Sequence, residues 1–234
     1  MLSTIAIIPS APVLVPELAG AAVAELSDLS AAVLAAAALL PPRWIVVGIG
    51  RSDDVLGPDG PNSVGTFAGF GADVPVSLSP PSGDRAEPPG ELPVCALLAA
   101  WVRGQVRPEA SARVHVYRGD HDANTALAAG RKLRAEIDRA PGPVGVLVVA
   151  DGANTLTAGA PGGYDPGDAD AQLALDDALA NGDLTALTGL PQRILGRVAF
   201  QVLAGLAEPG PRSAKELYRG SPYGVGYFAG AWQL

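Results

Sequence analysis

Four runs of apolar and β-branched residues stand out along the chain, and each is followed at once by polar or turn-forming residues. The runs are residues 4–8, 44–49, 113–117 and 144–150. Continuous apolar runs of this length are typical of strands that are covered on both faces, as in α/β sheets. A fifth segment, residues 223–232, alternates aromatic with small residues and predicts a final strand.

Helical patterns occupy the stretches between and after these strands. Apolar spacing, capping residues and helix-ending residues predict five helices: residues 16–40, 92–106, 123–139, 168–181 and 190–206. Strands that alternate with helices favour a three-layer α/β sandwich, in which helices flank a central sheet that is mostly parallel or mixed. We expect one domain spanning residues 1–234, with a long Pro-rich surface loop at residues 72–93.

Composition then narrows the class of protein. Hydrophobic residues make up 48% of the chain and charged residues 17%, which suits a filled core and excludes wholesale disorder. The net charge of −8 argues against nucleic acid or an anionic membrane as the main partner, because either requires a basic face. The single cysteine, Cys95, excludes an internal disulfide and a zinc cluster built from cysteines.

The location of the protein is also an inference from the sequence. The first residues lack the basic segment of a signal peptide, and the most apolar run, residues 31–40, is too short to span a bilayer. We therefore expect a cytoplasmic protein. The aromatic C-terminal strand could pair with another subunit in a homo-oligomer.

Polar side chains come directly after the four apolar runs: Ser10, Arg51, Asp53, Asp54, Asp120, His121, Asp151 and Asn154. Ligands of open α/β sheets bind where the carboxyl ends of the strands converge, so these side chains are candidates for one crevice. We predict a small-molecule pocket lined by Ser10, Arg51, His121 and Asn154. Arg51 is the expected partner of an anionic group on the ligand.

Among these residues, His121 is the one best suited to acid–base catalysis near neutral pH. A neighbouring aspartate can fix the tautomer of a histidine that acts in acid–base catalysis or donates a hydrogen bond to a ligand. The candidate catalytic residues are accordingly His121, Asp120 and Asp151. The competing interpretation, given equal weight, is a loop histidine that caps the next helix. His115 lies inside a predicted strand and is expected to be structural.

The residues favour neither a metal nor a bound cofactor. Zinc and iron sites usually combine at least two His or Cys with a carboxylate, a set that this chain does not display along its sequence. Carboxylates such as Asp53 and Asp54 could hold Mg²⁺, but such pairs are commonly solvated loop charges. A Ser10–His121–Asp151 triad is conceivable, although Ser10 lies in no nucleophile-elbow pattern. Glycine-rich segments form no dinucleotide-binding or P-loop motif.

Several segments, in consistent order from residue 5 to residue 228, resemble a single family. The matching segments are residues 7–17, 65–71, 120–121, 150–157, 160–165, 181–184 and 223–227. Together they are similar to the class III extradiol ring-cleavage dioxygenases of the B-subunit type and to the related Memo-like proteins. The resemblance implies the three-layer fold and a pocket at the strand ends.

The resemblance also shows where this chain departs from the family. The family binds non-haem Fe(II) through two histidines and a glutamate, and its two histidines would fall on Ser10 and near Arg51. Its catalytic histidine would fall on Asn154, and residues 190–206 contain no acid that could serve as the glutamate. The Asp120-His121 pair matches a family position that contacts substrate. Residues of these types cannot replace imidazoles on Fe(II), so the resemblance implies the fold without the ring-cleavage chemistry.

Four functions stay open on this basis. The first is a metal-free relative of the dioxygenases that binds a small ligand of aromatic or anionic character. The second is an enzyme of another class that uses Asp120, His121 and Asp151 in acid–base or hydrolytic chemistry without a metal. The third is a protein–protein scaffold with a vestigial pocket, and the fourth is a true metal-dependent dioxygenase with unrecognised ligands.

Overall fold

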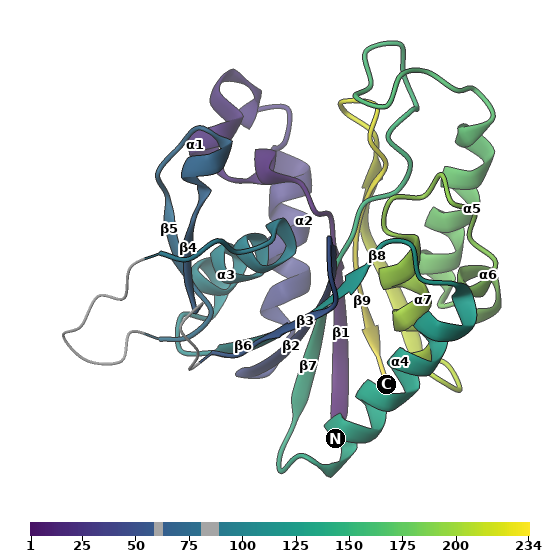
Figure 1. Ribbon diagram of the computed structural model, residues 1–234. Helices are drawn as coiled ribbons and strands as arrows, with labels where there is room; N and C mark the ends of the chain where they lie inside the picture. Colours follow the sequence, from purple (N-terminus) through teal and green to yellow (C-terminus); the bar gives the residue numbers. More distant parts are fainter. Residues whose placement is uncertain (59–62, 81–88) are drawn as a thin grey trace.

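The computed structural model describes residues 1–58, 63–80 and 89–234 (Figure 1). Its central sheet has the strand order β3-β6-β2-β7-β1-β9-β8. The strands of this sheet are β1 (Leu2–Ile8), β2 (Arg43–Gly50), β3 (Asp54–Leu56), β6 (Ser111–Arg118), β7 (Val144–Val149), β8 (Ser213–Gly220) and β9 (Tyr227–Gln233). β6, β2, β7 and β1 run parallel, whereas β3 at one edge and β9 and β8 at the other are antiparallel to their neighbours.

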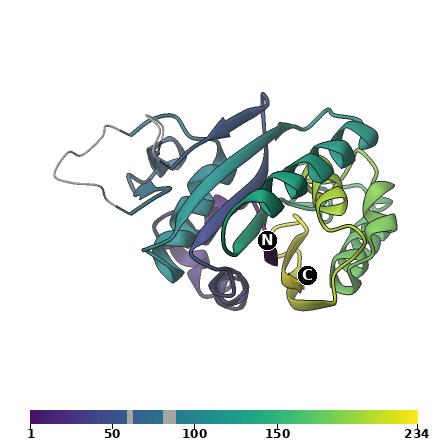
Figure 2. The ribbon, with the colours of Figure 1, turned by 90° about the horizontal axis from the view of Figure 1, so that it is seen from below.

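Helices cover both faces of the sheet, which confirms the predicted three-layer sandwich (Figures 1 and 2). One face carries α2 (Ser27–Ala38) and α3 (Val94–Val106). The other face carries α4 (Ala123–Arg139), α5 (Asp168–Asn181), α6 (Leu184–Thr188) and α7 (Arg197–Leu206). Among the described residues, no helix combines the length and apolar character that crossing a membrane requires.

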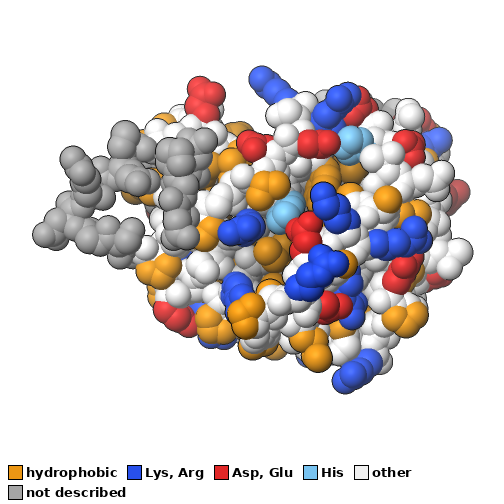
Figure 3. Space-filling view, turned by 60° about the horizontal axis from the view of Figure 1, so that its bottom comes forward, with side chains coloured by type: hydrophobic (Ala, Val, Ile, Leu, Met, Phe, Trp, Pro, Cys, Tyr) orange, Lys and Arg blue, Asp and Glu red, His pale blue; other side chains and the backbone are white. Residues whose placement is uncertain are grey.

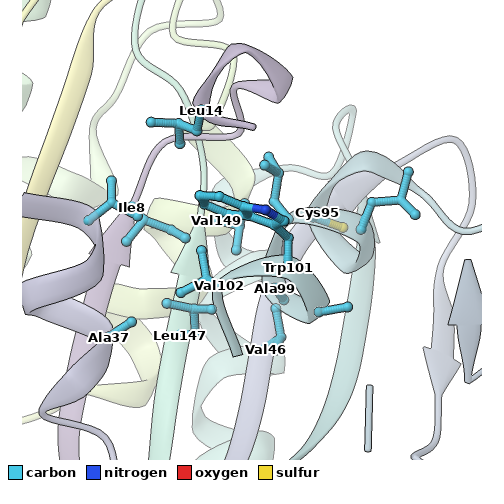
Figure 4. Close-up of a cluster of buried hydrophobic side chains, with 14 of the residues drawn as sticks. Ile8, Leu14, Ala37, Val46, Cys95, Ala99, Trp101, Val102, Leu147 and Val149 are labelled. Atoms are coloured by element: carbon cyan, nitrogen blue, oxygen red, sulfur yellow. The ribbon is translucent and has the colours of Figure 1, made fainter. Parts of the chain in front are cut away.

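Each face of the sheet has its own hydrophobic core, and β7 contributes to both. All six residues of β7 are buried, with Val146 and Val148 on the α4–α7 side and Leu147 on the α2–α3 side. Figure 4 shows the α2–α3 side, where Leu147 lies with Ile8 of β1 and Trp101 of α3. Full burial of one such side chain contributes about 1.5–3 kcal/mol, so the central strands hold the layers together.

The predicted helix over residues 16–40 is wrong in its first half. The short helix α1 (Pro16–Ala19) ends at Gly20, whose φ of 54° cannot continue an α-helix. A 3₁₀ turn over Gly20–Val23 follows, and α2 begins only at Ser27. Most of residues 16–25 are exposed, so apolar burial does not hold a continuous helix there.

Two other elements begin later than predicted, and two strands of the central sheet were not predicted. The last helix begins at Arg197 rather than at residue 190, and the final strand begins at Tyr227 rather than at residue 223. β3 has only three residues. β8 lies at an edge of the sheet and is mostly half-exposed, so neither strand shows a continuous apolar run.

The predicted surface loop over residues 72–93 is partly wrong. It contains β5 (Pro75–Ser77), which pairs with β4 (Val64–Thr66), and the Leu78 side chain is fully buried. Between these strands lies a 3₁₀ turn, Phe67–Phe70, whose N-cap Thr66 accepts the Ala68 amide at 3.2 Å. Residues 81–88 of the predicted loop lie outside the described residues.

Two glycines allow α4 and α7 to pack closely against each other. A Cβ atom at Gly130 of α4 would overlap the carbonyl oxygen of Val202, and one at Gly205 of α7 would overlap the carbonyl oxygen of Leu127. Backbone atoms cannot move aside as a flexible side chain can. The close packing of α4 and α7 therefore requires glycine, which has no side chain, at both positions.

This packing predicts opposite effects for two glycine-to-alanine changes. Gly205→Ala should lower the free energy of unfolding by about 1–3 kcal/mol, because the new methyl group forces α4 and α7 apart. Gly104→Ala in α3 is the matched control, since nothing lies within 4 Å of its Cβ position. It should raise stability by about 0.5–1 kcal/mol through helix propensity. Urea unfolding measures both, and a neutral Gly205→Ala would contradict the packing argument.

Candidate functional site

The carboxyl ends of the four parallel strands form one edge of the sheet. Ile8 of β1 pairs with Val149 of β7, and Val149 pairs with Gly48 of β2, so Ser10, Asp151 and Arg51 follow one another along this edge. After β1 and β2 the chain continues to the helices of the α2–α3 face, whereas after β7 and β6 it continues to the helices of the α4–α7 face. Neighbouring strand ends therefore diverge, which opens crevices between them.

Asp151 is the chemically most distinctive residue at this edge. Its Oδ1 accepts the backbone N–H of Ser10 at 2.7 Å, while Oδ2 has no partner among the described residues. Burial raises the pKa of Asp151 to about 7, against the opposing effect of the Ser10 hydrogen bond. A carboxyl group with this pKa and one free oxygen can take up or release a proton near neutral pH.

The loop that carries Asp151 is held in place by a buried amide. Gln172 of α5 accepts the Ala153 N–H at 2.8 Å and donates to Asp176 Oδ1 at 2.8 Å. A Cβ atom at Gly152 or Gly226 would overlap the Gln172 side chain, so these two glycines make room for it. Burial also raises the pKa of Asp176, to about 6. Sequence reasoning missed Gln172, because a glutamine inside a helix carries no motif.

Tyr227, at the start of β9, is a second residue that sequence reasoning missed. Burial, and then the nearby Asp151 carboxylate, raise the pKa of Tyr227. Its hydroxyl has no hydrogen-bond partner among the described residues. The hydroxyl remains protonated at neutral pH and can donate a hydrogen bond beside Asp151.

His121 belongs to a different cluster from Asp151. Its Nε2 lies 2.8 and 2.9 Å from the two carboxylate oxygens of Asp53, and Asp53 also accepts the Arg118 N–H at 2.8 Å. That backbone hydrogen bond is the main reason why the pKa of Asp53 is lowered. The predicted neighbour Asp120 instead binds the Arg118 side chain, with 3.0 Å between Nε and Oδ1. The aspartate that orients His121 is therefore Asp53.

The alternative role of His121, as a helix cap, is filled by its neighbour. Asp122 Oδ1 accepts the Thr125 N–H at 2.9 Å at the beginning of α4. The carbonyl oxygen of His121 accepts a hydrogen bond of 2.8 Å from Arg197 of α7, which fixes the loop against that helix. The His121 ring keeps 22% of its side-chain surface exposed.

Arg51 lines a groove of about 490 Å³ beside the end of β2. Its apolar walls come from Ile49, Leu92, Val94 and Val116, and Glu91 and Asp54 supply negative charge. The guanidinium of Arg51 is exposed and has no partner among the described residues. This groove is one strand away from Asp151.

The four residues predicted to form one pocket are thus divided among separate places. Ser10 lies with Asp151, Arg51 lines the β2 groove, and His121 pairs with Asp53. The side chain of Asn154 lies so close to Gly162 that a Cβ atom at Gly162 would overlap it. The backbone carbonyl oxygen of Asn154 accepts the Gly162 N–H at 2.9 Å. All four residues follow strands at the same edge of the sheet, but the structure does not bring them together in one pocket.

The donor set does not fit the Fe(II) centre that the family resemblance would imply. Ser10 has a neutral hydroxyl and Arg51 a cationic guanidinium, so neither position offers the imidazole that this Fe(II) centre would require. Within the part of the chain that the structure describes, no three His, Cys, Asp or Glu side chains are arranged to hold a metal ion.

Comparisons with known proteins bear on the fold alone. No family model matches the chain, and no curated protein sequence matches it. Among solved structures, the crystal structure of an uncharacterized protein from Escherichia coli K12 is similar, with a TM-score of 0.52 and 10% sequence identity. The alignment covers 98% of this chain and 99% of that chain. The likeness therefore extends over the whole fold.

The raised pKa of Asp151 predicts how stability depends on pH. Between pH 3.8 and about 7, the folded protein retains a proton that the unfolded chain has lost, so stability falls as pH rises through this window. Asp151→Asn removes the effect. The stability difference between wild type and variant should decline by at most about 1.4 kcal/mol per pH unit and level off above neutrality.

Asp122→Asn is the matched control for this titration. The hydrogen bonds from Thr125 lower the pKa of Asp122, so its contribution is lost as pH falls below about 4, the opposite direction. Urea unfolding of the three proteins across this pH range measures both effects. A pH-independent difference between wild type and Asp151→Asn would show that Asp151 is not held in a desolvated site.

Proposed function

We propose that this chain is a metal-independent relative of the class III extradiol dioxygenases that binds a small ligand at the carboxyl ends of its strands without cleaving a ring. The strand-end groove lined by Arg51 carries the proposal. Its volume of about 490 Å³ lies within the range of small-molecule sites in proteins, about 300–1,000 Å³. The family proposal itself is supported by the ordered sequence segments and the three-layer fold.

The lining of the groove supports a ligand with an aromatic ring and an anionic group. Apolar side chains of Ile49, Leu92 and Val94 offer a surface for a ring, and the unpaired Arg51 offers two parallel donors to a carboxylate. The acidic neighbours Glu91 and Asp54 would accept hydrogen bonds from hydroxyl groups on the ring and disfavour additional negative charge.

Titration with 4-hydroxybenzoate, with benzyl alcohol as the uncharged counterpart, tests this proposal. Arg51→Gln should weaken binding of the carboxylate about tenfold or more, because a charge-assisted hydrogen bond contributes about 1.5–3 kcal/mol. Arg139→Gln, which removes the same charge at the far end of α4, should bind as wild type does. Calorimetry measures the affinities, and equal affinity of wild type and Arg51→Gln would reject Arg51 as the anion partner.

The second candidate function is acid–base catalysis without a metal, and it is favoured by one observation. Asp151 has a pKa of about 7 and a free oxygen, and Tyr227 lies near it. His121 would act separately, since it is bound to Asp53 rather than to Asp151. Of the predicted set, Asp120 is bound to Arg118 through both oxygens, whereas Asp151 Oδ2 and His121 Nδ1 have no hydrogen-bond partner among the described residues.

A screen of activated esters, together with proton–deuterium exchange into keto acids, tests the catalytic candidate. Any activity that depends on this site should fall at least about a hundredfold in Asp151→Asn and rise or fall with a pKa near 7 in wild type. Asp120→Asn serves as the control, because its carboxylate is exposed and bound to Arg118. Equal rates for wild type and Asp151→Asn would exclude this role.

A further inference from the structure

A second groove lies on the opposite face of the sheet, between β6 and α4. Residues of β6 alternate, so that Val114 and Val116 enter the core beside α3, while Arg113, His115 and Tyr117 face the α4 side. The facing stripe of α4 consists of Ala129, Lys132, Leu133 and Glu136, which are spaced three and four residues apart. α4 packs mainly on α7, which leaves this part of β6 uncovered.

The groove is large enough for an organic molecule. Its main part measures about 580 Å³, and an adjoining part of about 360 Å³ shares Arg113, His115, Leu133 and Glu136 with it. Figure 3 shows this face, where a histidine (pale blue) lies among Lys or Arg (blue) and acidic (red) side chains beside exposed hydrophobic surface (orange). The apolar lining of the groove includes Val55 of β3, which is 56% exposed, and Leu133 of α4.

The two cations of the groove form no ion pair among the described residues, whereas several other arginines of this chain do. Arg118, Arg131, Arg134, Arg193 and Arg219 each bind a carboxylate. Arg113 and Lys132 have no hydrogen-bond or ion-pair partner among the described residues. Burial is the main cause that lowers the pKa of His115, and both cations are close enough to lower it as well. Glu136 faces the same ring and raises that pKa. Two unpaired cations and an imidazole thus converge from β6 and α4, while the carboxylates Asp53 and Asp54 line the groove at its β3 end.

We propose that this groove binds a small organic phosphate, with the phosphate group between Arg113, His115 and Lys132. A phosphate has three terminal oxygens and accepts hydrogen bonds from donors in several directions, which suits a guanidinium, an imidazole and an ammonium group on two elements. Glu136 would accept hydrogen bonds from hydroxyl groups on the carbon skeleton, and the skeleton would lie against Leu133 and Val55.

This site is independent of the one proposed above. Arg51 lines the groove beside α3, whereas Arg113 and Lys132 line the groove beside α4. The two grooves share Asp54 and Val116, but removing the charge of Arg51, Arg113 or Lys132 leaves the cations of the other groove in place. Failure of either proposal is therefore visible separately from failure of the other.

Proton NMR of the imidazole signals tests the proposal, with ribose phosphate, inorganic phosphate and ribose as probes. The chain has only two histidines, and His115→Asn assigns the two signals. Ribose phosphate should shift the His115 signal and raise the pKa of His115, because a bound dianion favours the imidazolium form. Inorganic phosphate should bind more weakly, since it lacks the hydroxyl groups that Glu136 would accept, and ribose should cause no shift.

Variants of the two cations complete the test. Arg113→Gln and Lys132→Gln should each weaken binding of ribose phosphate about tenfold or more, while Arg212→Gln and Arg51→Gln should bind as wild type does. Both groove cations are exposed, so the variants should fold, which circular dichroism checks. The proposal fails if ribose phosphate at millimolar concentration leaves the His115 signal unchanged. It also fails if ribose binds equally well or if neither groove variant weakens binding.

Discussion

Burial of β7 on both faces is the constraint on which the rest of the molecule depends. The strand lies between β1 and β2, and its side chains enter both hydrophobic cores. The chain leaves this strand directly into Asp151, so the carboxyl group is carried into a poorly hydrated position by the packing of its neighbours. Its raised pKa follows from this position rather than from a charged partner. The core and the candidate chemistry are thus consequences of the same packing.

The connections of the parallel strands explain why the polar residues do not form one pocket. Neighbouring strands send their chains to opposite faces of the sheet, so the side chains that follow them separate as well. Ser10 and Asp151 stay together because an amide hydrogen bond joins adjacent strand ends. His121 lies apart from them, because its ring binds Asp53 and its backbone carbonyl oxygen accepts a hydrogen bond from Arg197. Placement at one edge of a sheet is therefore weaker evidence for a shared site than contact between the loops.

Much of this architecture could be predicted from the sequence, and the exceptions have physical reasons. Continuous apolar runs identify β2 and β7 because both strands are covered on both faces, so that β7 buries all of its residues and β2 exposes none fully. β3 and β8 escape prediction because edge strands keep exposed and polar positions. The Asp53–His121 pair could not be predicted from the sequence, because the turn that follows β2 brings Asp53 back beside the end of β6. That contact is a property of the turn and of sheet order, which a local pattern does not contain.

The distribution of free cations is the feature that separates candidate ligand sites from ordinary surface. In a chain with net charge −8, acidic side chains are abundant, and six arginines form ion pairs with carboxylates: Arg107, Arg118, Arg131, Arg134, Arg193 and Arg219. A cation that lines a groove without such a partner keeps its capacity to bind an anion from solution, and no internal ion pair must be broken first. Arg51 on one face and Arg113 with Lys132 on the other meet this condition. The two grooves differ in that only the second is lined by an imidazole, that of His115, so the anion binding proposed there would depend on pH.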